Sequence, residues 1–190
     1  NGVGYKNNTN LDMNKIDFKT SLLFAPLAYA VHHFEEHIVF DFRAWRLQYF
    51  SDNNPLPTET VFIILTAITL VYLILHAVVK NKASAQSIIL FLMATQVANV
   101  FFHAGGTVVF WHFSPGLITA ILLYLPVNIL ISYEASKEGW VTKRSLLLLF
   151  LLGSFVFWLF ETVGPAPMVT VLVVTYIWIA YTSIKSKVAG

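Results

Sequence analysis

Five ionisable side chains lie within six consecutive residues of an otherwise apolar stretch: His32, His33, Glu35, Glu36 and His37. One charged group at the centre of a membrane-spanning helix costs about 2.5–3.5 kcal/mol on insertion scales. Two carboxylates and three imidazoles in one such helix therefore need proton sharing, burial against partners or a bound ion. Imidazole and carboxylate are ligands of Zn²⁺ and Fe²⁺. The cluster predicts metal or acid–base chemistry, with a purely structural buried network as the alternative.

Helical spacing divides the cluster into two groups, because residues three or four positions apart share a helix face. His32, Glu35 and Glu36 form one group, and His33, Glu36 and His37 form the other. Glu36 belongs to both groups and is therefore the predicted centre of the site.

Polar residues of two other apolar segments are predicted to lie at the same depth. Gln96, Asn99 and His103 share a face of the third segment, and Glu161 lies near the end of the fifth. We predict a metal site formed by His32, Glu36 and His103, catalytic roles for Glu35, Glu36 and Asn99, and supporting positions for His33, His37, Gln96, His112 and Glu161. His76 and Asn128 are expected to lie towards the opposite side of the membrane.

The segments that carry these residues are long and apolar. Hydrophobic residues make up 57% of the 190, and charged residues only 12%, against about 25% charged in soluble domains. A spanning helix needs about 20 mostly apolar residues. Six segments approach that length: Ser21–Phe40, Thr60–Val79, Gln86–Phe110, Gly116–Tyr133, Ser145–Val163 and Met168–Ile184.

We therefore predict an all-α, polytopic transmembrane helical bundle with six spans, five spans being the alternative. Asp41–Phe50 mixes aromatic residues with two arginines and predicts a short amphipathic helix in the interface after the first span. One transmembrane domain is expected over residues 19–187, between a polar tail at 1–18 and a short tail at 188–190. The chain has no cysteine, and its net charge of +2 is too weak to indicate nucleic-acid binding.

The basic residues predict the orientation, because cytoplasmic loops are rich in Lys and Arg. With six spans, Arg43 and Arg46 fall on one side. All other basic residues fall on the opposite side: Lys6, Lys15, Lys19, Lys80, Lys82, Lys137, Lys143, Arg144, Lys185 and Lys187. We expect a multi-pass protein of the cell membrane with both termini in the cytoplasm.

The stretch from His32 to Glu36 has the form H-x-x-E-E and lies in a first membrane span. In this the chain resembles the HXXEE-domain family of small bacterial integral membrane proteins, and the resemblance extends through Asn99, His103 and Pro115-Gly116. The resemblance implies a small multi-span helical protein with an enzyme-like set of polar intramembrane residues. It implies no substrate.

Three functions are compatible with these features. The first is a membrane enzyme that uses a divalent metal, Zn²⁺ or Fe²⁺, to hydrolyse or oxidise a lipidic or apolar small molecule. The second is a metal-free isomerase or cyclase of a terpenoid or sterol-like substrate, with Glu36 transferring a proton. The third is a non-enzymatic ion- or ligand-binding protein. The bilayer and an apolar small molecule are the expected partners.

Overall fold

The computed structural model describes residues 16–54 and 56–188, and this part of the chain contains helices and no strand, which confirms the all-α prediction. The elements are α1 (Phe18–Leu22), α2 (Phe24–Phe34), the π-helix η1 (Glu35–Val39), α3 (Phe42–Tyr49), α4 (Thr58–Val79), α5 (Lys82–Leu92), the π-helix η2 (Met93–Val97), α6 (Ala98–Phe110), α7 (Leu117–Thr119), the π-helix η3 (Ala120–Tyr124), α8 (Leu125–Lys137), α9 (Lys143–Val163) and α10 (Ala166–Val188).

These elements join into six long helical rods. Five rods, of 21 to 29 residues, are long and apolar enough to cross a membrane: α4, α5–η2–α6, α7–η3–α8, α9 and α10. The sixth is α1–α2–η1, whose pieces are separated only by Leu23, a residue with right-handed helical angles (φ −66°, ψ −21°). The chain is therefore a membrane-type helical protein, and its rods coincide with the six predicted segments.

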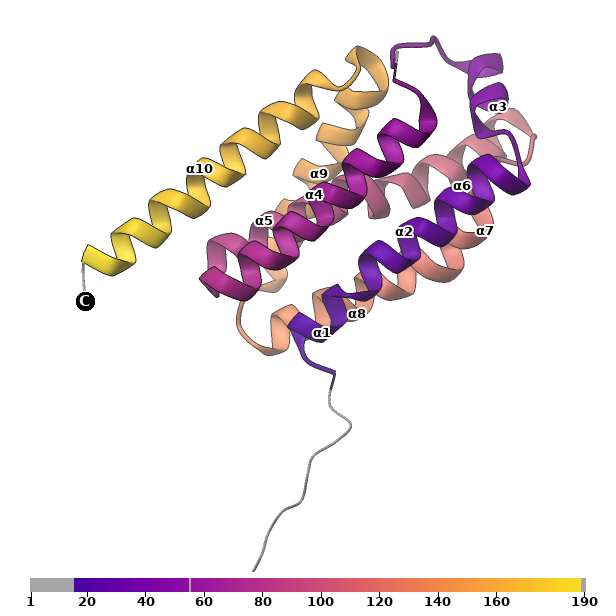
Figure 1. Ribbon diagram of the computed structural model, residues 1–190. Helices are drawn as coiled ribbons and strands as arrows, with labels where there is room; N and C mark the ends of the chain where they lie inside the picture. The colour runs from indigo at the N-terminus through magenta and orange to yellow at the C-terminus, as the bar shows by residue number, and fades with distance from the viewer. Residues whose placement is uncertain (1–15, 55, 189–190) are drawn as a thin grey trace, which may run out of the picture.

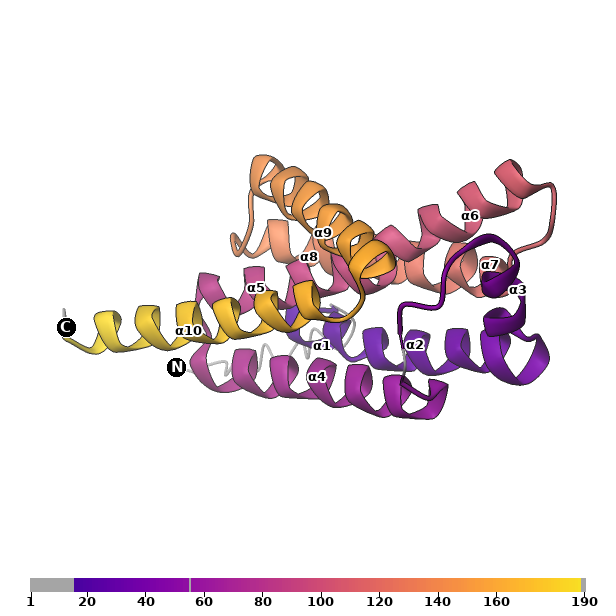
Figure 2. The same ribbon diagram turned by 90° about the horizontal axis from the view of Figure 1, so that it is seen from above.

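The rod α5–η2–α6 lies at the centre of the bundle (Figures 1 and 2). Of its most apolar window 67% is buried within the protein, against 28% or less for the other four long rods. Gly153 of α9 permits a close approach to this rod, since a Cβ atom there would lie 2.7 Å from Met93 Cβ and 2.9 Å from Ala94 N. Small residues at helix contacts in membranes let two backbones approach in this way.

The outer rods expose large apolar side chains. Ile63 is 65% exposed, Val78 76%, Val108 67% and Leu122 64%. Soluble proteins rarely expose apolar surface on this scale, and hydrocarbon chains of lipid are the medium in which it is stable. Polar side chains such as His32, Gln96 and His103 are buried instead.

Short turns separate the rods, and their sequences match their conformations. Asn81 and Thr142 each begin a helix with a capping box, in which the side chain accepts a hydrogen bond from the third helical N–H. Gly164 ends α9 with φ +88°, a left-handed value that glycine adopts without steric cost. The turn between α9 and α10 is short, because α10 begins at Ala166.

The two ends of the bundle differ. The end that carries α3 and the α9–α10 turn, here called the α3 end, lies opposite the C-terminus (Figure 1). Asp41 caps α3 by accepting from Ala44 N, and the Trp45 ring packs on Gly106, where a Cβ atom would lie 2.8 Å from it. The predicted short helix is therefore present. The predicted tail at 1–18 falls mostly outside the described residues, as do Lys6 and Lys15.

Candidate metal centre

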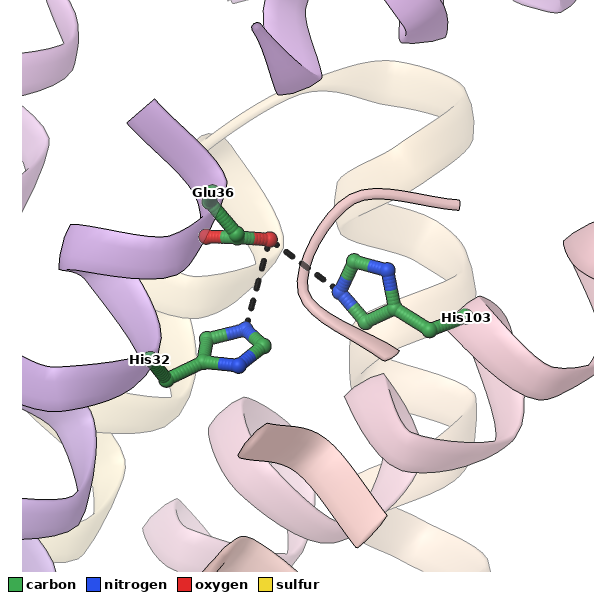
Figure 3. A group of neighbouring side chains, drawn as sticks. All are labelled: His32, Glu36 and His103. Carbon is green, nitrogen blue, oxygen red and sulfur yellow. Dashed lines mark ion pairs between the residues drawn. The ribbon is translucent and has the colours of Figure 1, made fainter. Parts of the chain in front are cut away.

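Three buried side chains from two rods meet at one point near the α3 end: His32 of α2, Glu36 of η1 and His103 of α6. His32 Nε2 lies 3.3 Å from Glu36 Oε1, and His103 Nε2 lies 3.1 Å from the same oxygen. Figure 3 shows the carboxylate directed between the two rings. His32 is 1% exposed, Glu36 7% and His103 0%. We call these three residues the triad.

Hydroxyl groups fix both imidazole rings from behind. His32 Nδ1 lies 2.8 Å from Thr119 Oγ1, and His103 Nδ1 lies 2.8 Å from Ser114 Oγ. The Thr119 hydroxyl also donates to the Gly116 carbonyl oxygen, so it accepts the His32 Nδ1 proton and leaves the Nε2 lone pair directed at the triad. Metal-binding histidines are typically oriented through their second nitrogen in this manner.

The inward nitrogen atoms of the triad have no hydrogen-bond partner in the described part of the chain. His32 Nε2 and His103 Nε2 are both buried without a hydrogen bond, and each lies at ion-pair distance from Glu36 Oε1. Buried polar atoms without a partner are uncommon in folded proteins and call for an explanation such as a bound ion. The three donor atoms lie within 4.8 Å of one another, close enough to hold one metal ion.

Gly116 closes the triad on the side of the fourth rod. A Cβ atom at this position would lie 2.8 Å from Glu36 Cγ, 2.8 Å from His32 Cε1 and 2.9 Å from His103 Cε1. Its φ of +96° also lies in the region that favours glycine. The backbone at Gly116 is therefore packed against all three triad residues at once.

A second group adjoins the triad through Glu36. His37 Nε2 lies 3.5 Å from Glu36 Oε2, and His33, Glu36 and His37 also have ligand atoms within 4.8 Å of one another. The His33 ring stacks on Phe62 at 4.4 Å between centroids. His33 and His37 line a cavity of about 310 Å³ that also contains Asn99, whose buried Oδ1 has no hydrogen-bond partner in the described residues. Glu36 is thus part of the triad and also lines this cavity.

Glu35 does not join the triad. Its carboxylate accepts hydrogen bonds from Ile118 N at 3.3 Å and Thr119 N at 2.7 Å, at the start of α7. Negative charge is favourable at a helix N-terminus, where backbone N–H groups lack partners. The carboxylate therefore positions Thr119, which in turn holds His32. The sequence placed Glu35 in the site because it shares a helix face with His32, but its oxygen atoms bind backbone.

The other predicted supporting residues are distributed around the site. Gln96 lies further from the α3 end than the triad, where it donates to the Ala25 carbonyl and accepts from Asn128 Nδ2. Glu161 lines the cavity and pairs with Arg46 at 2.9 Å. His112 is exposed and contacts Tyr49 OH at 2.7 Å, away from the triad. His76 binds Ser84 Oγ near the opposite end, as expected.

Sequence reasoning missed four residues that contact the triad: Ser114, Gly116, Thr119 and Tyr124. The Tyr124 ring packs on His32 at 4.3 Å between centroids. A Ser-Pro-Gly turn at the start of an apolar segment was the available signal for two of them, but a turn sequence does not reveal which buried residues it will face.

The family described as "Protein of unknown function with HXXEE motif" matches residues 23–131, more than half of the chain. This range contains the whole triad together with Ser114, Gly116 and Thr119. No curated protein and no solved structure matches the chain.

Proposed function

Because this chain belongs to the HXXEE family, and the motif itself contributes His32 and Glu36 to the triad, we propose that the protein is a membrane enzyme with an intramembrane divalent metal centre. His32, Glu36 and His103 hold the ion, which is Zn²⁺ or Fe²⁺. Two histidines and one carboxylate form a catalytic ligand set that leaves a coordination position open for water or substrate.

The spacing of the donor atoms carries this proposal. An ion with tetrahedral bonds of about 2.0–2.1 Å holds its ligand atoms roughly 3.3 Å from one another. The two separations at Glu36 Oε1 are 3.3 Å to His32 Nε2 and 3.1 Å to His103 Nε2. Both Nδ1 atoms are bound to hydroxyl groups and both Nε2 atoms lack a hydrogen bond, so the triad directs three donor atoms to one point, and two of their three separations match such an ion.

His32, Glu36 and His103 would hold the ion, which would activate a coordinated water at neutral pH by lowering the pKa of that water to about 7. Residues of the protein supply the other parts of the site. Glu36 offsets the positive charge, and Gly116 together with the buried walls excludes bulk water. Asn99 presents an unpaired carbonyl oxygen and amide group to a substrate in the cavity. Hydrolysis of a polar bond in a largely apolar molecule is the reaction that these parts favour.

The apolar cavity wall indicates the class of substrate, and the basic residues indicate the orientation of the protein in the membrane. Most of the cavity wall is apolar, so the substrate is an apolar small molecule or lipid that reaches the site from the bilayer. We place the protein in the cell membrane with both termini in the cytoplasm and the α3 end outside, because Arg43 and Arg46 alone among the described Lys and Arg residues lie at that end.

Elemental analysis of the purified protein tests the metal centre. The protein is prepared in detergent with a tag that contains no histidine, without added metal or chelator. We expect about one equivalent of zinc or iron per chain. Glu36→Gln keeps the size of the side chain but removes the charge that offsets the cation, so the metal should be lost.

Glu134→Gln is the matched control, because the same change is made to a carboxylate that is also buried but pairs with Lys137, at the end of the bundle opposite the triad. It should keep its metal. A wild-type protein without metal, or an equal loss in the two variants, would show that the proposal is wrong.

A further inference from the structure

The cavity beside the triad extends away from it between α4 and α10. It runs from Glu36 and His37 along α4 and α10, past Leu65 and Ile68 on the first helix and Leu172 on the second. Its volume of about 310 Å³ is at the lower end of the range for cavities that bind small molecules. Its long axis therefore joins the polar triad region to an apolar interior.

Two contacts between neighbouring segments lie near the ends of the cavity. On the α3 side, Asn53 donates to the backbone oxygen of Glu161 and its carbonyl oxygen touches Gly164, so the loop before α4 rests on the α9–α10 turn. On the other side, Tyr72 OH lies 2.5 Å from Thr175 Oγ1. Tyr72 and Thr175 are each about one turn beyond the last residues of α4 and α10 that line the cavity.

Between these two contacts, some residues that line the cavity are also exposed on the outer surface. Ile64 of α4 is 41% exposed and Val169 of α10 is 56% exposed, and both line the cavity. The two helices run alongside each other in Figures 1 and 2. On the α2 side, in contrast, Phe62 stacks with Tyr29 and His33 and fills the space. We call the opening between Ile64 and Val169 the α4–α10 window.

A basic residue lies at the α3 end of the same cavity. Arg43 is about half exposed and, within the described part of the chain, donates only to Asp52 Oδ2, at 2.8 Å. That hydrogen bond lowers the pKa of Asp52 below its usual value. An arginine side chain has five N–H donors, so Arg43 retains donors for a second acidic group. Arg46, by comparison, already binds Glu161, Asn53 and Ser51.

We propose that the α4–α10 window admits one acyl chain of a membrane phospholipid, whose phosphate is bound by Arg43. The inference rests on the proposed function, because it names the substrate class of the same site. The acyl chain lies between α4 and α10, in the half of the bilayer that contains α3. The bonds of the phospholipid near its head group then lie beside Glu36 and His37. An arginine fork is suited to a phosphate group.

Photo-crosslinking in vesicles tests the window. The probe is a phosphatidylglycerol with a diazirine in the middle of one acyl chain, added to vesicles of phosphatidylcholine that contain the full chain. Labelled peptides should derive from α4 and α10. Val169→Trp fills the window and should reduce the labelling about tenfold. Val173→Trp is the control: it lies one turn further along α10, is similarly exposed at 51%, and is not part of the cavity wall.

A second variant tests the head group. Arg43→Gln should lower labelling by the phosphatidylglycerol probe about tenfold, since a hydrogen bond to a charged group is lost. Labelling by a diacylglycerol with the same diazirine chain should not change, and free inorganic phosphate should not compete. Thermal unfolding of each variant in the same detergent confirms that it is folded.

The outcomes separate this inference from the metal centre. Equal labelling of the Val169→Trp and Val173→Trp proteins overturns the window, and an Arg43→Gln effect on both probes overturns the phosphate contact, whatever the metal content is. Labelling as expected in a protein without metal supports the window and defeats the metal centre instead.

Discussion

Gly116 determines how closely three side chains of the site approach the fourth rod. Gly116→Ala adds a carbon atom 2.8 to 2.9 Å from all three triad residues, at a φ of +96°. Backbone strain and overpacking each cost on the order of 1–3 kcal/mol. We expect a lower unfolding temperature in detergent and loss of most of the bound metal, measured by elemental analysis of the folded fraction.

Gly139→Ala separates the two causes. Gly139 has a comparable φ of +77° but no atom within 4 Å of an added Cβ. The Gly139→Ala protein should have a lower unfolding temperature, because of backbone strain, but should keep its metal. If both variants lose metal to the same extent, contact with the triad is not the reason.

The two hydroxyl groups behind the imidazoles give a second prediction at this scale. Ser114→Ala and Thr119→Val remove the partners of His103 Nδ1 and His32 Nδ1. Loss of such a partner typically weakens metal binding about 10- to 100-fold. Competition with a chromophoric chelator measures the change. Thr162→Val, which removes a hydroxyl bound only to its own helix, should leave the affinity unchanged.

The sequence predicted the triad but not its surroundings. His32 and Glu36 follow from four-residue spacing, and His103 follows from its depth in the third span. Glu35 was assigned to the site because its three-residue spacing places it beside His32, and both residues do contact Thr119. The spacing does not show that the Glu35 carboxylate binds backbone N–H groups instead of the triad. Ser114 and Thr119 are common residue types at a span start, so only the folded backbone shows that they reach the histidines.

At the scale of elements, the rods were the most predictable feature. A membrane span must be long and apolar, and Lys, Asn, Gly and Pro mark where each one stops, so the observed limits lie within a few residues of the predicted ones. The break at Leu23 and the three π-helices were not predictable. Each depends on which side chains the neighbouring rods present, and a single sequence does not contain that information in a local pattern.

The attachment of α3 can be tested through two adjacent glycines. Gly106→Ala places a Cβ atom 2.8 Å from Trp45 Cη2, whereas nothing lies within 4 Å of a Cβ atom at Gly105. We expect Gly106→Ala to cost about 1–3 kcal/mol by overpacking and to loosen α3. Limited proteolysis in the loop at 51–54 should accelerate in this variant. Equal cleavage rates in Gly105→Ala would contradict the expectation.

The loosening of α3 in the Gly106→Ala protein should also affect the triad. Phe42 of α3 packs against His103 at 5.3 Å and His37 at 5.9 Å between ring centroids. A loosened α3 therefore uncovers the triad to water, and the Gly106→Ala protein should lose its metal to a chelator faster than the Gly105→Ala protein.

For the whole molecule, the distribution of charge predicts the orientation. At the end opposite α3 lie all the other basic residues of the described chain: Lys19, Lys80, Lys82, Lys137, Lys143, Arg144, Lys185 and Lys187. A reporter that is active only in the cytoplasm should therefore work when fused after Lys187. A reporter that is active only outside should work in the loop at Asn53-Asn54. The reverse result at either position would reject the orientation.

The π-helices determine the direction in which the side chains that follow them point around the helix axis. Each adds one residue to a turn, so all later side chains of that rod are rotated by about 100° relative to an uninterrupted α-helix. The shift occurs in the rod of Glu36, in the rod of His103 and in the rod that follows Gly116. Deleting one residue from η2 would restore regular hydrogen bonding and rotate His103, which follows it in α6, away from His32 and Glu36. The site thus depends on a residue count as strictly as on residue identity, and a perfectly regular helix would be incompatible with it.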